Sequence, residues 1–390
     1  MESRKPLACQ RARFALPARE HYLNCAYMAP LSTDVAEAGV AAIRAGQTPF
    51  RLGVDDFFAG CDVVRARFAD LIGLSAPERV AVIPAVSYGT AIIARNTRLE
   101  RHQNVVTLGA QFPSNVHVWR MLCERAGAQM RVVAPPVEGP GRAAAWNEAI
   151  LDAIDGDTAL VAIGSVHWED GTRFELARIG ERAREVGAAF VVDGTQSVGA
   201  DPFDIQAVRP DALICAGYKW LTGPYSIGVA YIGERYEEGS PLEETWMSRE
   251  GSDDFAGLAG VATGYRSGAA RYDVGESANF ILVPMLGAAL EQLLGWGVAD
   301  IAAYVRALRD ELLASPRLEA LGVDARERGS AHLFGLRLPS GKNPEQVRAD
   351  LAARSVHVSV RGRVVRVAPY VYNDSTDVDA LVEGLEASLL

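Results

Sequence analysis

The sequence has 390 residues, of which 49% are hydrophobic and 23% are charged. These values are typical of a globular protein with a large core and exclude a disordered or fibrous chain. The formal net charge is −10 and charges of both signs are mixed along the chain, so we expect neither nucleic acid nor an anionic membrane as the main partner.

The N-terminal stretch 1–22 is basic but lacks the apolar centre of a secretory signal. No apolar run reaches the roughly 20 residues of a membrane span, and we therefore expect a cytoplasmic protein. The cysteines are odd in number and form no Cys-x-x-Cys pair: they are Cys9, Cys25, Cys61, Cys123 and Cys215. Neither a disulfide framework nor a metal site is predicted from this pattern.

Between residues 79 and 233, short apolar runs alternate with segments of helical periodicity. The runs are 79–85, 104–110, 129–136, 158–167, 188–196, 211–218 and 226–233. This alternation predicts an α/β domain whose mostly parallel sheet is covered on both faces. Only KWLTGPY joins the last two runs, which is too short for a helical crossover, so the run 226–233 is predicted to be antiparallel.

The composition changes after about residue 235. A polar, glycine-rich stretch reads as a long loop, and two helical patterns, a strand, a helix, a strand pair and a last helix follow it. We predict an N-terminal arm (1–20), a large domain (21–265) and a smaller α+β C-terminal domain (266–390).

The use of lysine draws attention to one residue. Of the 39 lysines and arginines only Lys5, Lys219 and Lys342 are lysines, and only Lys219 is flanked by core-like sequence. A buried lysine amine can form a Schiff base with a cofactor aldehyde, which arginine cannot. The alternative is a surface lysine whose charged end reaches solvent.

Asp193 and Gln196 close the apolar run 188–196, and Lys219 follows Asp193 by 26 positions. One helix and one strand fit in that distance, so both residues are expected at the same edge of the sheet. A carboxylate there would pair with the protonated ring nitrogen of pyridoxal 5′-phosphate (PLP), and Gln196 could donate to the phenolic oxygen of this cofactor. The alternative is an aspartate that caps the next turn.

Three further segments offer candidates with alternatives of their own. Ser87 lies where a strand meets a helix, which suits a phosphate or a simple helix cap. Phe112 could stack on the pyridine ring or belong to the core. Arg366 lies between valines on a strand, which suggests a carboxylate ligand, either an internal salt bridge or a substrate, and Arg361 lies close by in the sequence.

Together these residues resemble the class V aminotransferase family of fold-type I PLP enzymes, which includes cysteine desulfurases, kynureninase and isopenicillin N epimerase-like proteins. The stretch 191–232 is similar to the Asp-x-x-Gln…Lys block of that family, and the resemblance extends from residue 22 to residue 385. It implies a large domain with a mostly parallel seven-stranded sheet and a smaller α+β C-terminal domain.

The resemblance implies roles for single residues. Lys219 would carry the Schiff base, Asp193 would pair with the pyridine nitrogen and Gln196 with the phenolic oxygen. The positions that the family uses around the phosphate and the ring hold Val86, Ser87, Tyr218 and Phe112. Val86 stands where a hydroxyl residue is usual and would contribute only its amide, and Tyr218 stands where a histidine is frequent.

Substrate binding is implied for four residues. Arg366 matches the arginine that grips the substrate carboxylate, with Arg361 as a second candidate. Trp168 stands where asparagine is common, so His167 and Trp168 would shape an unusual pocket. His167 also fits a histidine satisfied at a strand end.

The resemblance also implies a homodimer with shared active sites, in which Ser277, within 272–279, would reach the phosphate of the partner subunit. Desulfurases carry a nucleophilic cysteine on a loop before the Arg366 segment, and this sequence has neither loop nor cysteine there. We therefore do not expect a cysteine desulfurase.

These residues predict a PLP-dependent enzyme that acts on a small amino acid, with Lys219 as general base at Cα. Transamination and C–S or C–C bond cleavage are the favoured reactions. An amino-acid epimerase and a non-catalytic PLP-fold sensor are the alternatives. A nicotinamide dehydrogenase is disfavoured because no Gly-x-Gly-x-x-Gly follows the first strand.

Overall fold

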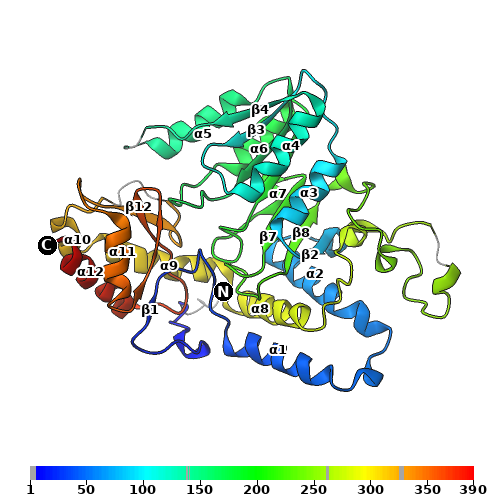
Figure 1. Cartoon of the computed structure of the whole chain (residues 1–390), viewed down its shortest axis with the longest axis horizontal. Helices are drawn as coiled ribbons and strands as arrows, with labels where there is room; N and C mark the ends of the chain where they lie inside the picture. The colour runs from blue at the N-terminus through cyan, green and yellow to red at the C-terminus, as the bar shows by residue number, and fades with distance from the viewer. Residues whose placement is uncertain (1–5, 138, 140, 261–262, 325–328) are drawn as a thin grey trace.

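A seven-stranded sheet forms the centre of the large domain (Figure 1). The structure, a computed structural model, describes residues 6–137, 139, 141–260, 263–324 and 329–390. The strands of this sheet are β2 (Val80–Ile83), β3 (Asn104–Leu108), β4 (Gln129–Val133), β5 (Thr158–Gly164), β6 (Ala189–Asp193), β7 (Ala212–Ala216) and β8 (Gly228–Ile232). Each lies within one of the seven apolar runs, so the predicted α/β class is confirmed.

The strand order is β2-β8-β7-β6-β5-β3-β4. Strand β8 pairs antiparallel with both β7 and β2, whereas the other pairings are parallel. The prediction for the run 226–233 is thus confirmed. Parallel strands bring their carboxyl ends to one edge, which places the ends of β5, β6 and β7 side by side.

Helices cover both faces of the sheet, which explains why its strands, apart from the edge strand β4, are almost entirely buried. Along each strand, alternate side chains enter two different core clusters. One cluster contains Val192 and Leu213 together with residues of α2 and α6, and the other contains Val191 and Ile214 together with residues of α3 and α4. The bounds of the helices around the sheet are α2 (Ala59–Ile72), α3 (Val86–Asn96), α4 (His117–Ala126), α5 (Arg142–Ala153), α6 (Leu176–Glu185) and α7 (Ile205–Val208).

The C-terminal part of the chain forms a separate α+β unit, drawn in orange and red in Figure 1. Its antiparallel sheet has the order β11-β12-β9 and is packed against helices. The strands are β9 (Phe334–Arg337), β10 (Val356–His357), β11 (Ser359–Arg361) and β12 (Val364–Val367), and the helices are α9 (Val298–Leu313), α10 (Pro316–Ala320), α11 (Pro344–Ala352) and α12 (Ser375–Leu389).

An N-terminal segment joins this unit. Strand β1 (His21–Tyr22) pairs parallel with β10, and Asn24 forms a bridge to Ala368. Residues 21–24 thus pair with the C-terminal unit, whereas the sequence predicts that they belong to the large domain. The domain boundaries near residues 20 and 265 stay a prediction.

Helices α1 (Thr33–Ala45) and α8 (Leu282–Trp296) lie beside each other and α8 also packs on α2, at the base of the view in Figure 1. The chain before α8 is held to the large sheet by Asp273, which pairs with Arg65 of α2 and accepts from the amide of Val82 at 2.8 Å. Within the described residues no single helix is long and apolar enough to cross a membrane, and α8 with α9, bent by 74°, meets that criterion only as a pair.

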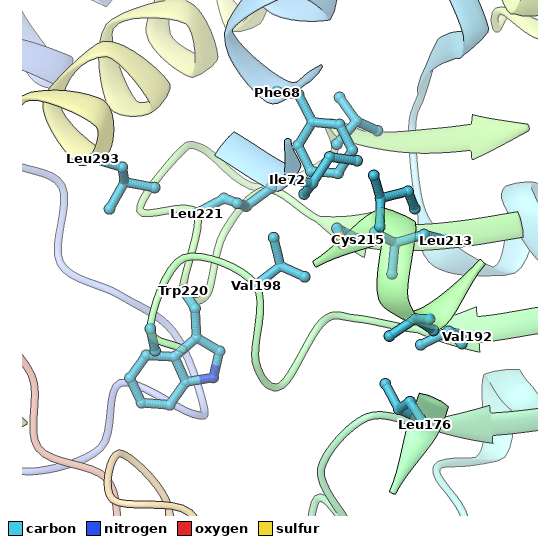
Figure 2. Packing of buried hydrophobic residues seen from close by; sticks show 14 of the residues in the cluster. Phe68, Ile72, Leu176, Val192, Val198, Leu213, Cys215, Trp220, Leu221 and Leu293 are labelled. Carbon is cyan, nitrogen blue, oxygen red and sulfur yellow. The ribbon is translucent and has the colours of Figure 1, made fainter. Parts of the chain in front are cut away.

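The turn after β7 is anchored in the core. Figure 2 shows Trp220 and Leu221, the two residues after Lys219, among core residues that include Val198 and Leu293 of α8. Gly199 has a φ of 101°, and a Cβ built there would lie 2.2 Å from the carbonyl oxygen of Trp220. Glycine is therefore needed for the loop after β6 to approach the Lys219 turn this closely.

Candidate active site

A cavity of about 260 Å³ opens at the carboxyl ends of β5, β6 and β7. Ligands of open α/β sheets bind at this edge. Most of the predicted site residues line the cavity: Val86, Ser87, Phe112, Trp168, Asp193, Gln196, Tyr218 and Lys219. The sequence therefore located the cavity correctly, while the roles of the single residues remain to be tested.

Lys219 lies in the turn after β7, and only 7% of its surface is exposed. Its Nζ atom lies 5.5 Å from the ring centre of Phe112 and 5.6 Å from that of Tyr218. Burial lowers the pKa of Lys219 to about 8; Asp193 opposes this shift, and Arg366 and Arg361 add to it. The neutral amine, the form that a nucleophilic lysine requires, is thus more populated near neutral pH than it is for an exposed lysine.

Asp193 is the last residue of β6, and its side chain lies at the cavity wall. Its Oδ1 accepts from the amide of Thr195 at 3.0 Å. Burial raises the pKa of Asp193, against the effects of Thr195 and Lys219. The carboxylate is therefore short of a positive partner, and a cationic group in the cavity would stabilise its charged form.

Gln196 is held in one orientation by two neighbours. Its Oε1 accepts from the indole Nε1–H of Trp220 at 2.9 Å, and its Nε2 donates to the carbonyl of Ala26 at 3.2 Å. An amide nitrogen has two protons, so Nε2 keeps one donor beyond the bond to Ala26. That donor is available to an acceptor oxygen in the cavity that Gln196 lines.

The N-terminus of α3 forms another part of the wall. Its cap residue, Ala85, makes no side-chain hydrogen bond to the helix. The amides of Tyr88 and Gly89 donate to the carbonyl of Ala85, whereas those of Val86 and Ser87 have no acceptor among the described residues. Free amides at a helix N-terminus suit an anion such as a phosphate.

Aromatic rings form another part of the cavity wall. Phe112 and Trp168 meet edge to face with ring centres 5.4 Å apart, and the Trp168 Nε1–H donates to the carbonyl of Ala110 at 2.7 Å. Tyr218 packs against Tyr225 at 4.6 Å. Aryl walls of this kind suit a flat aromatic ligand and exclude water from its faces.

Arg366 and Arg361 lie on neighbouring strands of the C-terminal unit, outside the wall of the cavity. Arg366 is 1% exposed and makes no ion pair within 4 Å in the described part of the chain. Its Nη1 donates to the carbonyl of Trp168 at 2.7 Å, and burial lowers its pKa to about 9. The guanidinium of Arg361 lies 5.4 Å from the ring centre of Trp168.

Two predicted residues have their side chains elsewhere. The imidazole of His167 contacts the carbonyl of Ala110 through Nε2 at 3.1 Å and lies 3.3 Å from Asp170 through Nδ1. It does not line the cavity, and its buried position favours the alternative of a histidine with a structural role at the strand end. Ser277 is 4% exposed, its carbonyl accepts from the thiol of Cys61, and it does not line the cavity of its own chain either.

Several wall residues were not predicted from the sequence, and Gln111 is the most informative of them. Its Oε1 accepts from the amide of Phe112 at 2.8 Å, and its Nε2 is buried without a partner in the described structure. Thr195 was missed as well; its hydroxyl accepts from the amide of Ala216 and so ties β6 to β7. The only signal for both residues was their position at the end of an apolar run: Gln111 follows the run 104–110, and Thr195 is the last residue but one of the run 188–196.

None of the five cysteines lines the cavity, and all five lie in the described residues. Cys25, Cys61, Cys123 and Cys215 are buried. Burial raises the pKa of Cys25 to about 12. The strands that carry Arg361 and Arg366 are joined by only two residues, Gly362 and Arg363, so no long loop exists there to bring in a thiol.

Comparison with known proteins agrees with this geometry. The class V aminotransferase family model matches residues 54–381. A cysteine desulfurase of Enterobacter sp. (strain 638) is 28% identical over 98% of both chains, and one of Escherichia coli (strain CFT073) is 27% identical over 96% of both chains. Both relatives are named cysteine desulfurases, whereas the sequence of this chain led us to expect a different activity.

Two solved structures have the same fold. The cystine C–S lyase C-DES, in complex with its reaction product cysteine persulfide, superposes with a TM-score of 0.84 at 20% identity over 94% of this chain and 97% of that chain. The cysteine desulfurase CsdA of Escherichia coli superposes with a TM-score of 0.78 at 21% identity over 97% of both chains.

Proposed function

The chain belongs to the class V aminotransferase family and is a PLP-dependent enzyme, and from this premise we propose that it cleaves the C–S bond of a cystine-like amino acid. The sulfur product would leave for solution and would not be transferred to a thiol of the protein. The absence of any cysteine from the cavity carries this choice of reaction. The cavity, the unpaired Arg366 and the nature of the relatives support it.

The residues of the cavity fit PLP. Lys219 supplies a buried amine of lowered pKa, and the raised pKa of Asp193 marks a carboxylate that lacks a cation. The free amides of Val86 and Ser87 suit the phosphate, and Phe112 lies where a ring could stack. When bound, PLP supplies an electron sink for the electron pair that remains at Cα after a bond to that carbon has broken.

In this proposal four side chains have separate roles. Nζ of Lys219 would hold the cofactor covalently, and after release it would take the proton from Cα of the substrate. Asp193 would keep the ring nitrogen protonated, and Gln196 would donate its remaining amide proton to the phenolic oxygen. Arg366 would bind the α-carboxylate, and we leave His167 out because its contacts point away from the cavity.

A desulfurase in the strict sense needs a protein thiol to accept the sulfur. The two-residue connection between β11 and β12 offers no such thiol, and burial in the core raises the pKa of Cys215 and Cys25. A β-elimination needs no thiol, because the leaving sulfur departs with its electron pair. For cystine the balance is cystine plus water to pyruvate, ammonia and cysteine persulfide, with no external oxidant or reductant.

The products distinguish the candidate reactions. The purified enzyme with PLP would be given L-cystine and L-cysteine, and pyruvate, alanine and ammonia would be measured. We expect pyruvate and ammonia in equal amounts. Alanine in place of pyruvate would contradict the proposal and indicate a desulfurase, whereas conversion only in the presence of a keto acid would indicate an aminotransferase.

The remaining alternatives have outcomes of their own. Exchange of the Cα proton with D₂O and formation of the D-isomer, without pyruvate, would indicate an epimerase. A protein that binds PLP and converts no amino acid of a broad panel would be a sensor.

We also propose that the chain forms a homodimer in which Ser277 lies near the partner's site. Family membership supports this proposal. Light scattering after size-exclusion chromatography gives the mass directly. A species of 42 kDa, one chain, at micromolar concentration would contradict it.

A further inference from the structure

We propose that Ser359 and Asn24 are positioning residues that aim the guanidinium of Arg366 at the substrate carboxylate. This inference rests on the proposed role of Arg366. It adds two residues that have no obvious chemistry of their own and that come from opposite ends of the chain.

The three side chains form a hydrogen-bond chain whose direction is fixed. Nε of Arg366 lies 3.0 Å from Oγ of Ser359, and this Oγ lies 3.0 Å from Oδ1 of Asn24. Arginine can only donate, so Oγ of Ser359 must accept from it. The single hydroxyl proton is then free to point at Asn24, which accepts it through the amide oxygen.

The backbone places these side chains with little freedom. Ser359 and Arg366 are direct cross-strand partners in the β11–β12 pair, so their side chains lie on one face of the sheet. Asn24 is held beside them because the chain around it pairs with Ala368, whose amide donates to Leu23 and whose carbonyl accepts from Cys25. The N-terminal segment thus supplies the acceptor for the hydroxyl of Ser359.

The remaining donors of Arg366 show what this arrangement achieves. Nη1 donates to the carbonyl of Trp168, and Nη2 is buried without a partner in the described structure. With Nε and Nη1 held from two sides, the guanidinium cannot turn, and Nη2 is left for an incoming group. A buried cation with a free donor is well suited to a carboxylate.

The chemical nature of the two partners also matters. The hydroxyl of Ser359 accepts from Nε, and the neutral amide of Asn24 accepts from that hydroxyl, so neither group cancels the positive charge of Arg366. A carboxylate in their place would form an internal ion pair and compete with the substrate. Neutral positioning residues therefore preserve both the direction and the charge of Arg366.

Site variants can test the proposal. Ser359→Ala and Asn24→Ala each break the chain, Ser359→Thr keeps the hydroxyl, and Arg366→Ala reports the carboxylate role itself. Thr158→Val is a matched control, since the Thr158 hydroxyl is buried and donates to Oδ1 of Asn104 at 3.0 Å, at the far end of β5. For each holoenzyme one measures kcat and KM for the amino acid that is turned over best, the inhibition constant of propionate, and the Kd of PLP.

We expect Ser359→Ala to raise KM and the inhibition constant of propionate about tenfold, the effect of one charge-assisted hydrogen bond, with kcat and the Kd of PLP within about twofold of wild type. Asn24→Ala should act in the same direction, and Ser359→Thr should restore KM. Propionate has no amine, so its binding reports the arginine even if no amino acid is turned over.

Two results would overturn the inference and one would overturn its basis. If Arg366→Ala weakens propionate but Ser359→Ala does not, the positioning role is wrong while the carboxylate role stands. If Ser359→Ala changes kcat, KM and the Kd of PLP in the same proportion as Thr158→Val does, the hydroxyl is only structural. If Arg366→Ala leaves propionate binding unchanged, the proposed carboxylate site itself fails.

Discussion

Trp220 donates its indole N–H to Oε1 of Gln196 at 2.9 Å, so the residue after Lys219 helps to determine which end of the Gln196 amide faces the cavity. Without this bond only the contact of Nε2 with the carbonyl of Ala26 would oppose a rotation of the amide by 180°, which would present its oxygen to the cavity. An acceptor facing the phenolic oxygen of PLP would then replace a donor. The core position of Trp220, visible in Figure 2, therefore has a consequence for the cofactor site.

Replacement of Trp220 by phenylalanine tests this relationship. Phenylalanine keeps most of the apolar volume but removes the N–H, so we expect the Kd of PLP to rise about fivefold to tenfold, the effect of one hydrogen bond. The Kd can be measured from the visible absorbance of bound PLP. Trp146→Phe is the matched control, because the indole N–H of the buried Trp146 on α5 donates to the carbonyl of Val133 at 3.3 Å and Trp146 does not line the cavity. Equal effects of the two changes would argue against a specific role of Trp220.

Replacement of Lys219 by alanine should abolish covalent attachment of the cofactor. The amine is buried between Phe112 and Tyr218, and its side chain is the only lysine side chain that lines the described cavity. After borohydride reduction, mass spectrometry should find PLP on the peptide that contains Lys219 in the wild type and on no peptide of the variant. PLP fixed to Lys342 or Lys5 in the variant would refute the assignment.

The rate of covalent PLP attachment to the cofactor-free protein should increase as the pH rises through about 8 and level off above it. Burial lowers the pKa of Lys219 to about 8, and only the neutral amine attacks an aldehyde. The positive charge of Arg366 contributes to that shift, so Arg366→Ala should move the midpoint to higher pH. Nα-acetyllysine, with an amine pKa of about 10.4, serves as the reference. A midpoint near 10 in the wild-type protein would contradict the prediction.

Gln111 should contribute a hydrogen bond to a ligand in the cavity. Because the Phe112 amide donates to its Oε1, its Nε2 must face away from that bond, and it has no partner in the described structure. Gln111→Glu keeps the acceptor for Phe112 and loses the donor, so we expect a weakening of about fivefold to tenfold in the Kd of PLP or in KM for the substrate. Gln111→Met, which loses both, should be no better than Gln111→Glu. Unchanged constants in Gln111→Glu would show that Nε2 binds no ligand.

The sequence was sufficient for the parts of the fold that have a strong local pattern. All seven strands of the large sheet lie in apolar runs, and six of them are almost entirely buried because both faces of the sheet are covered, whereas the edge strand β4 is partly exposed. Helix α1 was not predicted, and only Val35 and Gly39 of its thirteen residues are buried. The pairing of β1 with β10 joins segments more than 300 residues apart, which no local pattern can reveal.

The same distinction applies to the site. Lys219 and Asp193 were found because they end strands and because lysine is rare in this sequence. Asn24 and Ser359 were not predicted, because the proposed role of each depends on a hydrogen-bond chain to Arg366 that joins distant segments of the sequence. His167 does not line the cavity, although Val166 and Trp168 on either side of it do; its ring packs against that of Trp146, with ring centres 5.0 Å apart.

His332 should make the fold sensitive to acid. It is 2% exposed, its Nε2–H donates to the carbonyl of Gln196 at 2.7 Å, and its ring meets that of Trp220 at 4.6 Å. Burial lowers the pKa of His332 to about 4, whereas in the unfolded chain it is near 6.5. As the pH falls from about 6.5 toward 4, His332 becomes protonated in the unfolded state but stays neutral in the folded state. The free energy of unfolding therefore decreases over this range.

The variant His332→Gln retains an N–H donor and removes this titration. We expect the wild type to lose about 2 kcal/mol more of its unfolding free energy than the variant between pH 7 and pH 4.5, measured by urea denaturation. If His332→Gln and the wild type lose stability in parallel, the imidazole must be protonated in the folded protein, and its contact with Gln196 must then be made by a charged ring.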